Sequence, residues 1–397
     1  MNKTKIAYIS FDTVPAPKGA AIHIQAFSMA LAAALGDIHL LTVSPATELI
    51  ESVEIHPRLR HTMLPALGEN LIERVLYFRR HLRFWLHHKQ FNIIHIRSIY
   101  EGLAIAIHKN QYCDKLVFEV NGLPSIELKY RYPAVVEDRE LLHKLYSQEQ
   151  ICFAAADLII TPSTVTAKYL QQHRNIPADK IRVIPNGVDL DVFTYRLDNS
   201  NDLPLQMLYF GTLAPWQGVN LAIEALGLIN QDIPANLTVI GQAREYQIQA
   251  LQKLALKLGV EDKLTILEPI LQKDLVKKIH HSNVILSPLT ANDRNLIQGC
   301  CPLKILEAMA TGTPVIASDL PVVRELGEDG VDFLLVKPGS AKAIKDGVLR
   351  LHRDKQLGKQ FAVNARQRIE NYYTWQQAGD ALVQAYQELG INRSITF

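Results

Sequence analysis

The sequence predicts an α/β protein made of two doubly wound domains, and three observations support this prediction. The chain has 397 residues, which is more than one hydrophobic core usually accommodates. A strand, a glycine-containing loop and a helix follow one another at Lys5–Leu35 and again at Leu205–Leu228, as at the start of doubly wound domains. Apolar residues make up 48% of the chain and charged residues 21%, which is typical of a globular protein.

Charge, cysteine usage and the N-terminus argue against a nucleic-acid-binding protein, a disulfide-bonded protein and a membrane-spanning protein. The net charge of +2 gives no electrostatic basis for binding nucleic acid. The four cysteines contain no C-x-x-C pair, which favours a reducing compartment. The first residues lead directly into a short strand, and no apolar stretch reaches the length of a membrane span. We therefore expect a cytoplasmic protein, with peripheral contact at the inner membrane face left open.

The first loop of the chain is a candidate phosphate site. It joins the expected strand Lys5–Ser10 to the expected helix Ala20–Leu35, and ligands of doubly wound sheets bind beyond the carboxyl ends of the strands. Lys18, Gly19 and Ala20 therefore lie where a phosphate would meet a helix N-terminus. The loop has no G-x-G-x-x-G motif, so the nicotinamide or flavin fingerprint is missing. An ordinary βα turn is the alternative.

Residues Glu69–Gln90 form an expected amphipathic helix with a basic side. Apolar residues recur at a helical period, and the basic residues, among them Arg79, Arg80 and Arg83, outnumber the acidic ones. Such a helix is able to lie on an anionic membrane surface. The favoured alternative is a helix that packs on the sheet and exposes its basic edge, because a doubly wound fold needs amphipathic helices.

Polar side chains follow two expected strands in the first domain. His95 and Arg97 lie at the end of the strand Phe91–Arg97, and Glu119 and Asn121 lie at the end of the next strand. The carboxyl ends of parallel strands meet at one edge of a sheet, so we expect these four side chains to gather in a polar pocket. A histidine in a buried strand is otherwise more often a satisfied core group.

The segment Asn292–Leu320 is expected to form a loop, a helix, a turn and a strand. Pro302 suits the first position of a helix, and good helix formers run from Leu303 to Ala310. Gly312 then accepts the left-handed conformation of a helix C-terminus, and Pro314–Ser318 has the pattern of a short buried strand.

The start of this helix carries residues that suit a nucleoside diphosphate. Unpaired N–H groups and the positive end of the helix dipole follow Gly299, Cys300 and Cys301, and they favour a phosphate group. Lys304 and Glu307 follow at i+4 and i+7 from Cys300 on the same face. The lysine would reach a bound anion, and the carboxylate would accept the hydroxyl groups of a ribose. A surface helix with a Lys304–Glu307 ion pair is the alternative.

Several runs of the sequence resemble the family 4 glycosyltransferases. PLKILEAMATGTPVIASDLPVVREL, which begins at Pro302, resembles the second half of the family's E-x7-E signature. IRVIPNGVDLDVF, which begins at Ile181, is similar to the family's phrase at the end of the first domain, and Tyr373–Leu389 resembles its terminal helix. The resemblance implies the GT-B fold, in which two Rossmann-like domains face a central cleft, and it implies that Glu307 binds the ribose.

The sequence departs from the family pattern in its donor loops. The first glutamate of the signature, which in the family touches the transferred sugar, falls on Gly299. An arginine and a lysine that usually grip the diphosphate correspond to Thr212 and Gln217. The resemblance therefore implies a subgroup with altered donor-phosphate contacts, in which Lys304, Arg294 and Lys18 are the candidates to supply the missing positive charge.

The acceptor side shows a further departure. A histidine near the transferred sugar in the family corresponds to Asn121, and Glu119 lies two residues earlier on the same strand face.

The resemblance implies a retaining glycosyltransferase, a hexosyltransferase that moves a sugar from a UDP- or GDP-sugar donor to a hydroxyl acceptor in a glycan, glycolipid or small molecule. No further cofactor and no metal are expected. Two alternatives stay open, namely a non-catalytic nucleotide-sugar-binding partner subunit and another GT-B enzyme such as a UDP-sugar epimerase. The expected domains are 1–195 for the acceptor and 205–375 for the donor, with a linker at 196–204 and a terminal helix at 376–397 that crosses back to the first domain.

The candidate site residues fall into three groups. The catalytic candidates are Lys304, Arg294, Asn121 and Glu119. The donor-binding candidates are Lys18, Gly19, Ala20, Gly211, Thr212, Gln217, Cys300, Cys301, Pro302, Leu303, Lys304 and Glu307. The acceptor-binding candidates are His95, Arg97 and Asn121.

Overall fold

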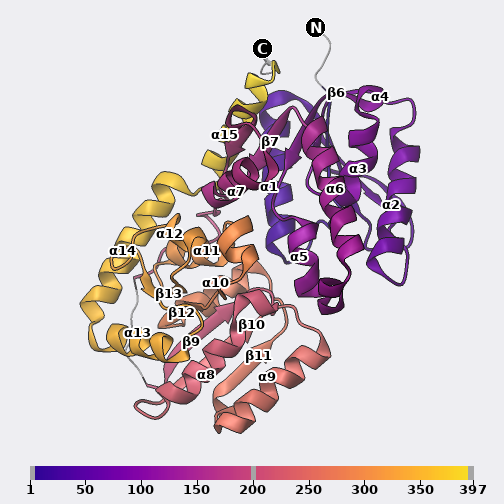
Figure 1. Ribbon diagram of the computed structural model, residues 1–397. Helices are drawn as coiled ribbons and strands as arrows, with labels where there is room; N and C mark the ends of the chain where they lie inside the picture. Colours follow the sequence, from indigo (N-terminus) through magenta and orange to yellow (C-terminus); the bar gives the residue numbers. More distant parts are fainter. Residues whose placement is uncertain (1–4, 198–202, 392–397) are drawn as a thin grey trace. The chain divides into compact units, whose positions relative to one another are not determined.

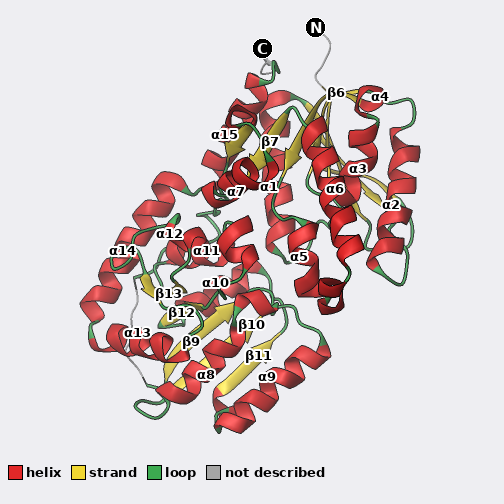
Figure 2. Cartoon of the chain, viewed as in Figure 1, coloured by secondary structure: helices red, strands yellow, loops and turns green. Residues whose placement is uncertain are grey.

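The computed structural model describes residues 5–197 and 203–391 and divides the chain into two compact α/β units (Figure 1). The first unit consists of residues 1–185 with 376–397, and the second of residues 186–375. The expected linker lies partly outside the described residues. Each unit has a sheet of mainly parallel strands with helices packed against it (Figure 2). The predicted α/β class is therefore confirmed.

The first unit contains an eight-stranded sheet with the order β3-β4-β2-β1-β5-β6-β7-β8. All neighbours pair in parallel except β3 and β4, which are antiparallel. The strands are β1 (Lys5–Ile9), β2 (Asp37–Val43), β3 (Ile50–His56), β4 (Leu59–Leu64), β5 (Phe91–Ile96), β6 (Cys113–Glu119), β7 (Leu158–Thr161) and β8 (Ile181–Val183). The order reverses between β1 and β5, so their carboxyl ends form the switch point of this sheet.

The helices of the first unit follow the strands in the alternating order that the sequence predicts. They are α1 (Gly19–Leu35), α2 (Leu71–Leu86), α3 (Ile99–Ile107), α4 (Lys109–Tyr112), α5 (Pro124–Arg131), η1 (Pro133–Glu137), α6 (Arg139–Ala155), α7 (Thr164–Arg174), η2 (Ala178–Lys180) and the C-terminal α15 (Trp375–Glu388). Phe78 of α2, Ile105 of α3 and Phe153 of α6 pack with Ile94 of β5 in one buried core. Side chains alternate along a strand, so the opposite face of the sheet carries Tyr8 and His95.

The hairpin of β3 and β4 at the edge of the first sheet was not predicted from the sequence. Its two strands are joined by Pro57 and Arg58. This connection lacks the glycine or asparagine that marks most two-residue hairpin turns. The local pattern therefore lacked the usual signal of a two-residue hairpin, although Pro57 is compatible with a turn.

The second unit contains a six-stranded parallel sheet with the order β11-β10-β9-β12-β13-β14. Its strands are β9 (Leu205–Phe210), β10 (Ala235–Ile240), β11 (Leu264–Leu267), β12 (Val284–Ser287), β13 (Val315–Ser318) and β14 (Leu334–Val336). Its helices are η3 (Pro215–Gln217), α8 (Val219–Ile229), α9 (Glu245–Leu258), η4 (Glu261–Lys263), α10 (Gln272–His280), the π-helical turn η5 (Arg294–Gln298), α11 (Leu303–Thr311), α12 (Pro321–Arg324), α13 (Ala341–Arg353) and α14 (Lys355–Tyr372). Asp354 separates the last two of these helices, because it follows the end of α13 and caps the start of α14 through its side chain.

Candidate functional site

The helix α11 begins and ends where the sequence predicts, apart from one residue at its C-terminal end. Gly312, with a φ of 82°, ends the helix in the left-handed conformation that glycine adopts readily. A β-carbon on Gly312 would come within 2.7 Å of Tyr195 Cε2, so the position also has no room for a side chain. Pro302 has no side-chain group that caps the first turn, so the N–H groups there suit an anion.

The segments of the second unit that carry the donor-binding candidates start at the switch point of its sheet. The strand order reverses between β9 and β12, and ligands of doubly wound sheets bind at the carboxyl ends of such strands. Gly211 directly follows β9, and the chain that leaves β12 runs through η5 into α11. The candidates Gly211, Thr212, Gln217, Arg294 and Lys304 therefore belong to segments that start from this one edge of the sheet.

The ammonium group of Lys304 contacts residues at the donor loop, which consists of residues 211–217. Its Nζ donates a hydrogen bond to Gln217 Oε1 and lies 4.3 Å from the centre of the Tyr209 ring. The Tyr209 hydroxyl in turn donates to the carbonyl oxygen of Thr212 at 2.7 Å. These contacts fix the ammonium beside the loop at residues 211–217. Lys304 and Gln217, which were both predicted as donor contacts, are thus brought together.

Gly211 makes room for this lysine. A β-carbon at Gly211 would lie 3.2 Å from both Cε and Nζ of Lys304. Its φ of 128° is a conformation that residues with side chains rarely adopt. A residue with a side chain at this position would therefore strain the backbone and push the end of Lys304 by a few tenths of an ångström.

Glu307 is a buried carboxylate whose oxygen atoms are available to accept hydrogen bonds from a ligand. Its exposed fraction is 8% and that of Lys304 is 7%, so the alternative of a surface helix is wrong. No described residue donates a hydrogen bond to the Glu307 carboxylate or forms an ion pair with it. Burial raises the pKa of Glu307 to about 7, against the opposing charge of Lys304. Burial, together with the charge of Arg294, lowers the pKa of Lys304 to about 7.

Arg294 is placed by the π-helical turn that precedes α11. Its guanidinium lies 5.2 Å from the centre of the Trp216 ring, and its Nη1 donates to Asn295 Oδ1 at 3.1 Å. Asn295 is fully buried and donates to the carbonyl oxygens of Trp216 and Thr290. This amide therefore ties the turn to the loop at residues 215–217. The amide nitrogen of Asn295 is thus occupied inside the unit.

The residues just before α11 differ in accessibility. The carbonyl oxygen of Cys301 accepts a hydrogen bond from Asn186 Nδ2 at 2.7 Å, and burial raises the pKa of the Cys301 thiol to about 12. Cys300 is partly exposed. Cys301 thus fixes the loop, whereas Cys300 is the member of the pair that a ligand is able to contact.

The four polar residues predicted to gather in the first unit do meet, and Glu119 is their centre. Glu119 Oε2 lies 2.9 Å from His95 Nε2, and Arg97 Nε donates to Glu119 Oε1 at 3.1 Å. Asn121 Nδ2 also donates to Glu119 Oε1. Glu119 and His95 are buried, whereas Asn121 is partly exposed. Asn121 is therefore the member of this cluster most open to an acceptor.

Three further partners of this cluster were not predicted from the sequence. Tyr8 donates to Glu119 Oε2 at 2.6 Å, and His23 Nε2 lies 2.7 Å from Glu119 Oε1. The Tyr386 hydroxyl of α15 lies 2.7 Å from His95 Nδ1. Both ring nitrogens of His95 are thus occupied, and its side chain has no exposed surface. His95 and Glu119 hold the cluster together from inside.

Charge keeps Glu119 ionised despite its burial. Burial alone would raise its pKa, but the charges of His23 and Arg97 hold the pKa well below the usual range. Arg97 responds in the opposite direction, since burial would lower its pKa and the charge of Glu119 raises it. The cluster is therefore a buried ion network and not a set of neutral hydrogen bonds.

The predicted phosphate loop of the first unit contains an ion pair. Lys18 Nζ lies 2.6 Å from Asp12 Oδ1, and Asp12 Oδ2 lies 3.4 Å from Arg97 Nη1. Lys18 also occupies the N-cap position of α1, directly before Gly19 and Ala20. The ion pair joins this loop to the Glu119 cluster, and it would have to rearrange before Lys18 could bind a phosphate.

Both units match known sequence families. Residues 17–192 match the family described as "Glycosyltransferase Family 4", and residues 198–368 match the family described as "Glycosyl transferases group 1". The two matches follow one another and together take in most of the chain. They also correspond closely to the two structural units.

Curated relatives carry glycosyltransferase names. The chain is 23% identical to a D-inositol 3-phosphate glycosyltransferase of Xylanimonas cellulosilytica over 96% of each chain. It is 28% identical to the amylovoran biosynthesis glycosyltransferase AmsK of Erwinia amylovora, over 64% of this chain and 62% of that one.

Solved structures share the arrangement of two α/β domains. Sucrose-phosphate synthase of Thermosynechococcus elongatus superposes with a TM-score of 0.83 at 22% identity, covering 98% of this chain and 99% of that chain. Alr3699/HepE of Anabaena, solved in complex with UDP-glucose, superposes with a TM-score of 0.75 at 17% identity, covering 97% and 99% of the two chains. These likenesses, with the two doubly wound units, show the GT-B fold.

Proposed function

Because the chain belongs to the family 4 glycosyltransferases, we propose that it moves a sugar from a nucleotide-sugar donor to a hydroxyl acceptor with retention of configuration. The observation that supports this proposal most strongly is the pair of buried charges on α11. Lys304 and Glu307 lie at the switch point of the second sheet, and the Glu307 carboxylate accepts no hydrogen bond from the described residues. A diphosphate at Lys304 and a ribose at Glu307 would satisfy both groups.

Lys304 would stabilise the leaving group of this reaction. The bond between the sugar carbon and the diphosphate oxygen breaks, so negative charge grows on the diphosphate in the transition state. The Lys304 ammonium, the Arg294 guanidinium and the N–H groups at the start of α11 offset this charge. The acceptor oxygen forms the new bond to the sugar carbon, and its proton passes to the leaving diphosphate oxygen. No protein nucleophile takes part in this scheme.

Gln217 would give this chain contacts to the donor phosphates that differ from those usual in the family. It occupies the position of a family lysine and accepts a hydrogen bond from Lys304 before any ligand binds. An incoming diphosphate would replace the amide oxygen of Gln217 as the partner of Lys304. The proposed subgroup thus uses one buried lysine on α11 in place of cations in the donor loop.

Turnover tests the proposed reaction directly. Purified protein is incubated with UDP-, GDP- and ADP-sugars and an acceptor panel that includes D-inositol 3-phosphate and oligosaccharides. Release of a nucleoside diphosphate together with a glycosylated acceptor is the expected result. A donor that binds tightly without any release across the panel would instead support a non-catalytic nucleotide-sugar-binding subunit.

Replacing Glu307 by alanine is expected to weaken donor binding by about 1–3 kcal/mol, because a charged hydrogen-bond acceptor for the ribose is lost. Calorimetric titration with the donor measures the change. Glu245→Ala, which removes an exposed carboxylate on α9, is the matched control and should leave affinity unchanged. Equal affinity of the wild type and Glu307→Ala would remove Glu307 from the site.

The pH dependence of kcat/KM is expected to be a narrow bell centred near pH 7. Lys304 binds an anion only when protonated, so activity falls as the pH rises through its pKa of about 7. Glu307 offers two acceptor oxygens only when ionised, so activity falls as the pH drops through its pKa of about 7. Lys304→Arg should extend the alkaline limb and Glu307→Gln the acid limb. A profile that stays flat from about pH 6 to pH 8 would contradict both assignments.

A further inference from the structure

We propose that one side of α2 docks the first unit on an anionic membrane surface. This docking face consists of Ile72, Leu76, Arg80, Arg83 and Phe84. At 3.6 residues per turn, these positions fall within about 120° of the helix circumference. All five side chains are exposed.

The packing of α2 on the sheet does not use the docking face. Its inner side buries Val75, Phe78, Leu82 and Leu86, and Phe78, Leu82 and Leu86 join the core of the first unit. Figure 1 shows α2 at the periphery of that unit. The helix thus has one apolar stripe for the core and a second group of apolar residues on its outer side.

The outer apolar residues are large and strongly exposed. Ile72 is 60% exposed, Leu76 58% and Phe84 83%. Among the side chains whose exposure the structure describes, in residues 5–50, 56–197 and 203–391, no other large apolar one has an exposed fraction as high as that of Phe84. Several large apolar side chains on one helix face mark a surface that contacts another phase or molecule.

The charged residues of the docking face are Arg80 and Arg83, and one exposed acidic residue, Glu73, lies within the same arc of the helix. Neither Arg80 nor Arg83 forms an ion pair or hydrogen bond with any described residue. The acidic residue nearest to them on the helix, Glu73, is occupied at the N-terminus, where its carboxylate accepts from Glu69 N and Asn70 Nδ2. The docking face therefore presents two free guanidinium groups beside exposed apolar side chains.

An anionic lipid surface fits this combination better than a second copy of the chain. Arginine side chains pair with lipid phosphates while leucine, isoleucine and phenylalanine enter the acyl boundary, as in helices that lie in the membrane interface. A two-fold dimer through the same face would bring Arg80 and Arg83 of both copies together, which like charges oppose. Within the described part of the chain no helix has the length and apolar content needed to cross a bilayer, so contact by a helix face would be peripheral.

Vesicle co-sedimentation tests this proposal without any need for donor or acceptor. The intact protein should pellet with vesicles of phosphatidylglycerol and phosphatidylcholine, should not pellet with phosphatidylcholine alone, and should be released by salt. Arg80→Ser with Arg83→Ser should weaken partitioning about 20- to 30-fold. Leu76→Ser with Phe84→Ser should weaken it at least about tenfold. Lys355→Ser with Lys359→Ser, at exposed positions of α14, is the matched charge control.

A fluorescence measurement shows whether the face enters the lipid. Phe84→Trp should be quenched by brominated lipids in anionic vesicles, whereas Tyr246→Trp, at a 61% exposed position on α9, should not be. Failure of the intact protein to bind anionic vesicles at low salt would overturn the proposal. Binding that survives both double substitutions would also overturn it. Self-association that disappears in Leu76→Ser with Phe84→Ser would assign the face to a second copy.

Discussion

Replacing Lys304 by alanine is expected to lower kcat by about 10²–10³, as the loss of other electrostatic stabilisers does. The leaving diphosphate gains negative charge, and the helix N-terminus alone supplies only about half a positive charge. Neither Thr212 nor Gln217 is able to supply the remainder. The rate of nucleoside diphosphate release at saturating donor measures the effect. Arg294→Ala is expected to act in the same direction.

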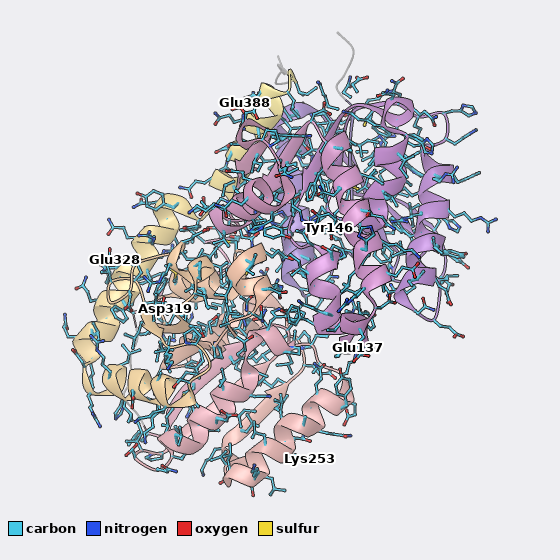
Figure 3. All side chains as sticks on the ribbon, in the orientation of Figure 1. Glu137, Tyr146, Lys253, Asp319, Glu328 and Glu388 are labelled. Atoms are coloured by element: carbon cyan, nitrogen blue, oxygen red, sulfur yellow. The ribbon has the colours of Figure 1, made fainter. Side chains whose placement is uncertain are left out.

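Two further variants separate charge from packing at Lys304. Lys304→Met keeps the volume of this buried side chain and should lose as much activity as Lys304→Ala. Lys253→Ala removes an exposed lysine of α9, labelled in Figure 3, and should keep full activity. Full activity of both Lys304→Ala and Arg294→Ala would place the diphosphate elsewhere, and Lys18 with Gly19 would become the leading candidates.

The second large effect is expected when Glu119 is replaced, and it concerns the stability of the first unit. Glu119→Ala should lower the free energy of unfolding of the first unit by about 3–5 kcal/mol, because it leaves the buried Arg97 guanidinium without its counter-charge and other buried donors without an acceptor. Arg97 and His23 both depend on this carboxylate, and the hydroxyl of Tyr8 loses its acceptor. Denaturation in urea, followed by circular dichroism, measures the change. Two transitions are to be fitted separately if the units unfold independently.

A surface ion pair in the same unit provides the control for Glu119. Arg182 Nη2 lies 2.7 Å from Oε2 of Glu388, which Figure 3 labels on α15. Both side chains are exposed, so Glu388→Ala should cost at most about 1 kcal/mol. Equal effects of Glu119→Ala and Glu388→Ala would show that the Glu119 cluster does not hold the unit together.

The parts of the fold and the site that follow local rules could be predicted from the sequence. The limits of α11 follow from Pro302 and Gly312, because each of these residues has a strong backbone preference. The meeting of His95, Arg97, Glu119 and Asn121 follows from a general rule, since parallel strands place their carboxyl ends at one edge of a sheet.

The parts that depend on long-range packing could not be predicted. The resemblance implied a terminal helix that returns to the first domain, but nothing in the sequence indicated that Tyr386 of this helix would contact His95, 291 positions away. The burial of Lys304 and Glu307 could not be predicted either, because their spacing fits an exposed ion pair as well as a buried site. The sequence therefore indicated which residues of α11 are candidates for the site, but it did not indicate that their charged side chains are buried.

A crystal structure with a bound nucleoside diphosphate tests the central claim most directly. UDP, GDP and ADP are screened first by thermal shift, and the most stabilising one is soaked into crystals. We predict the diphosphate within hydrogen-bonding distance of Lys304 Nζ and the first N–H groups of α11, with both ribose hydroxyls donating to Glu307. Density for the diphosphate away from α11, with Lys304 still bonded to Gln217, would contradict the claim.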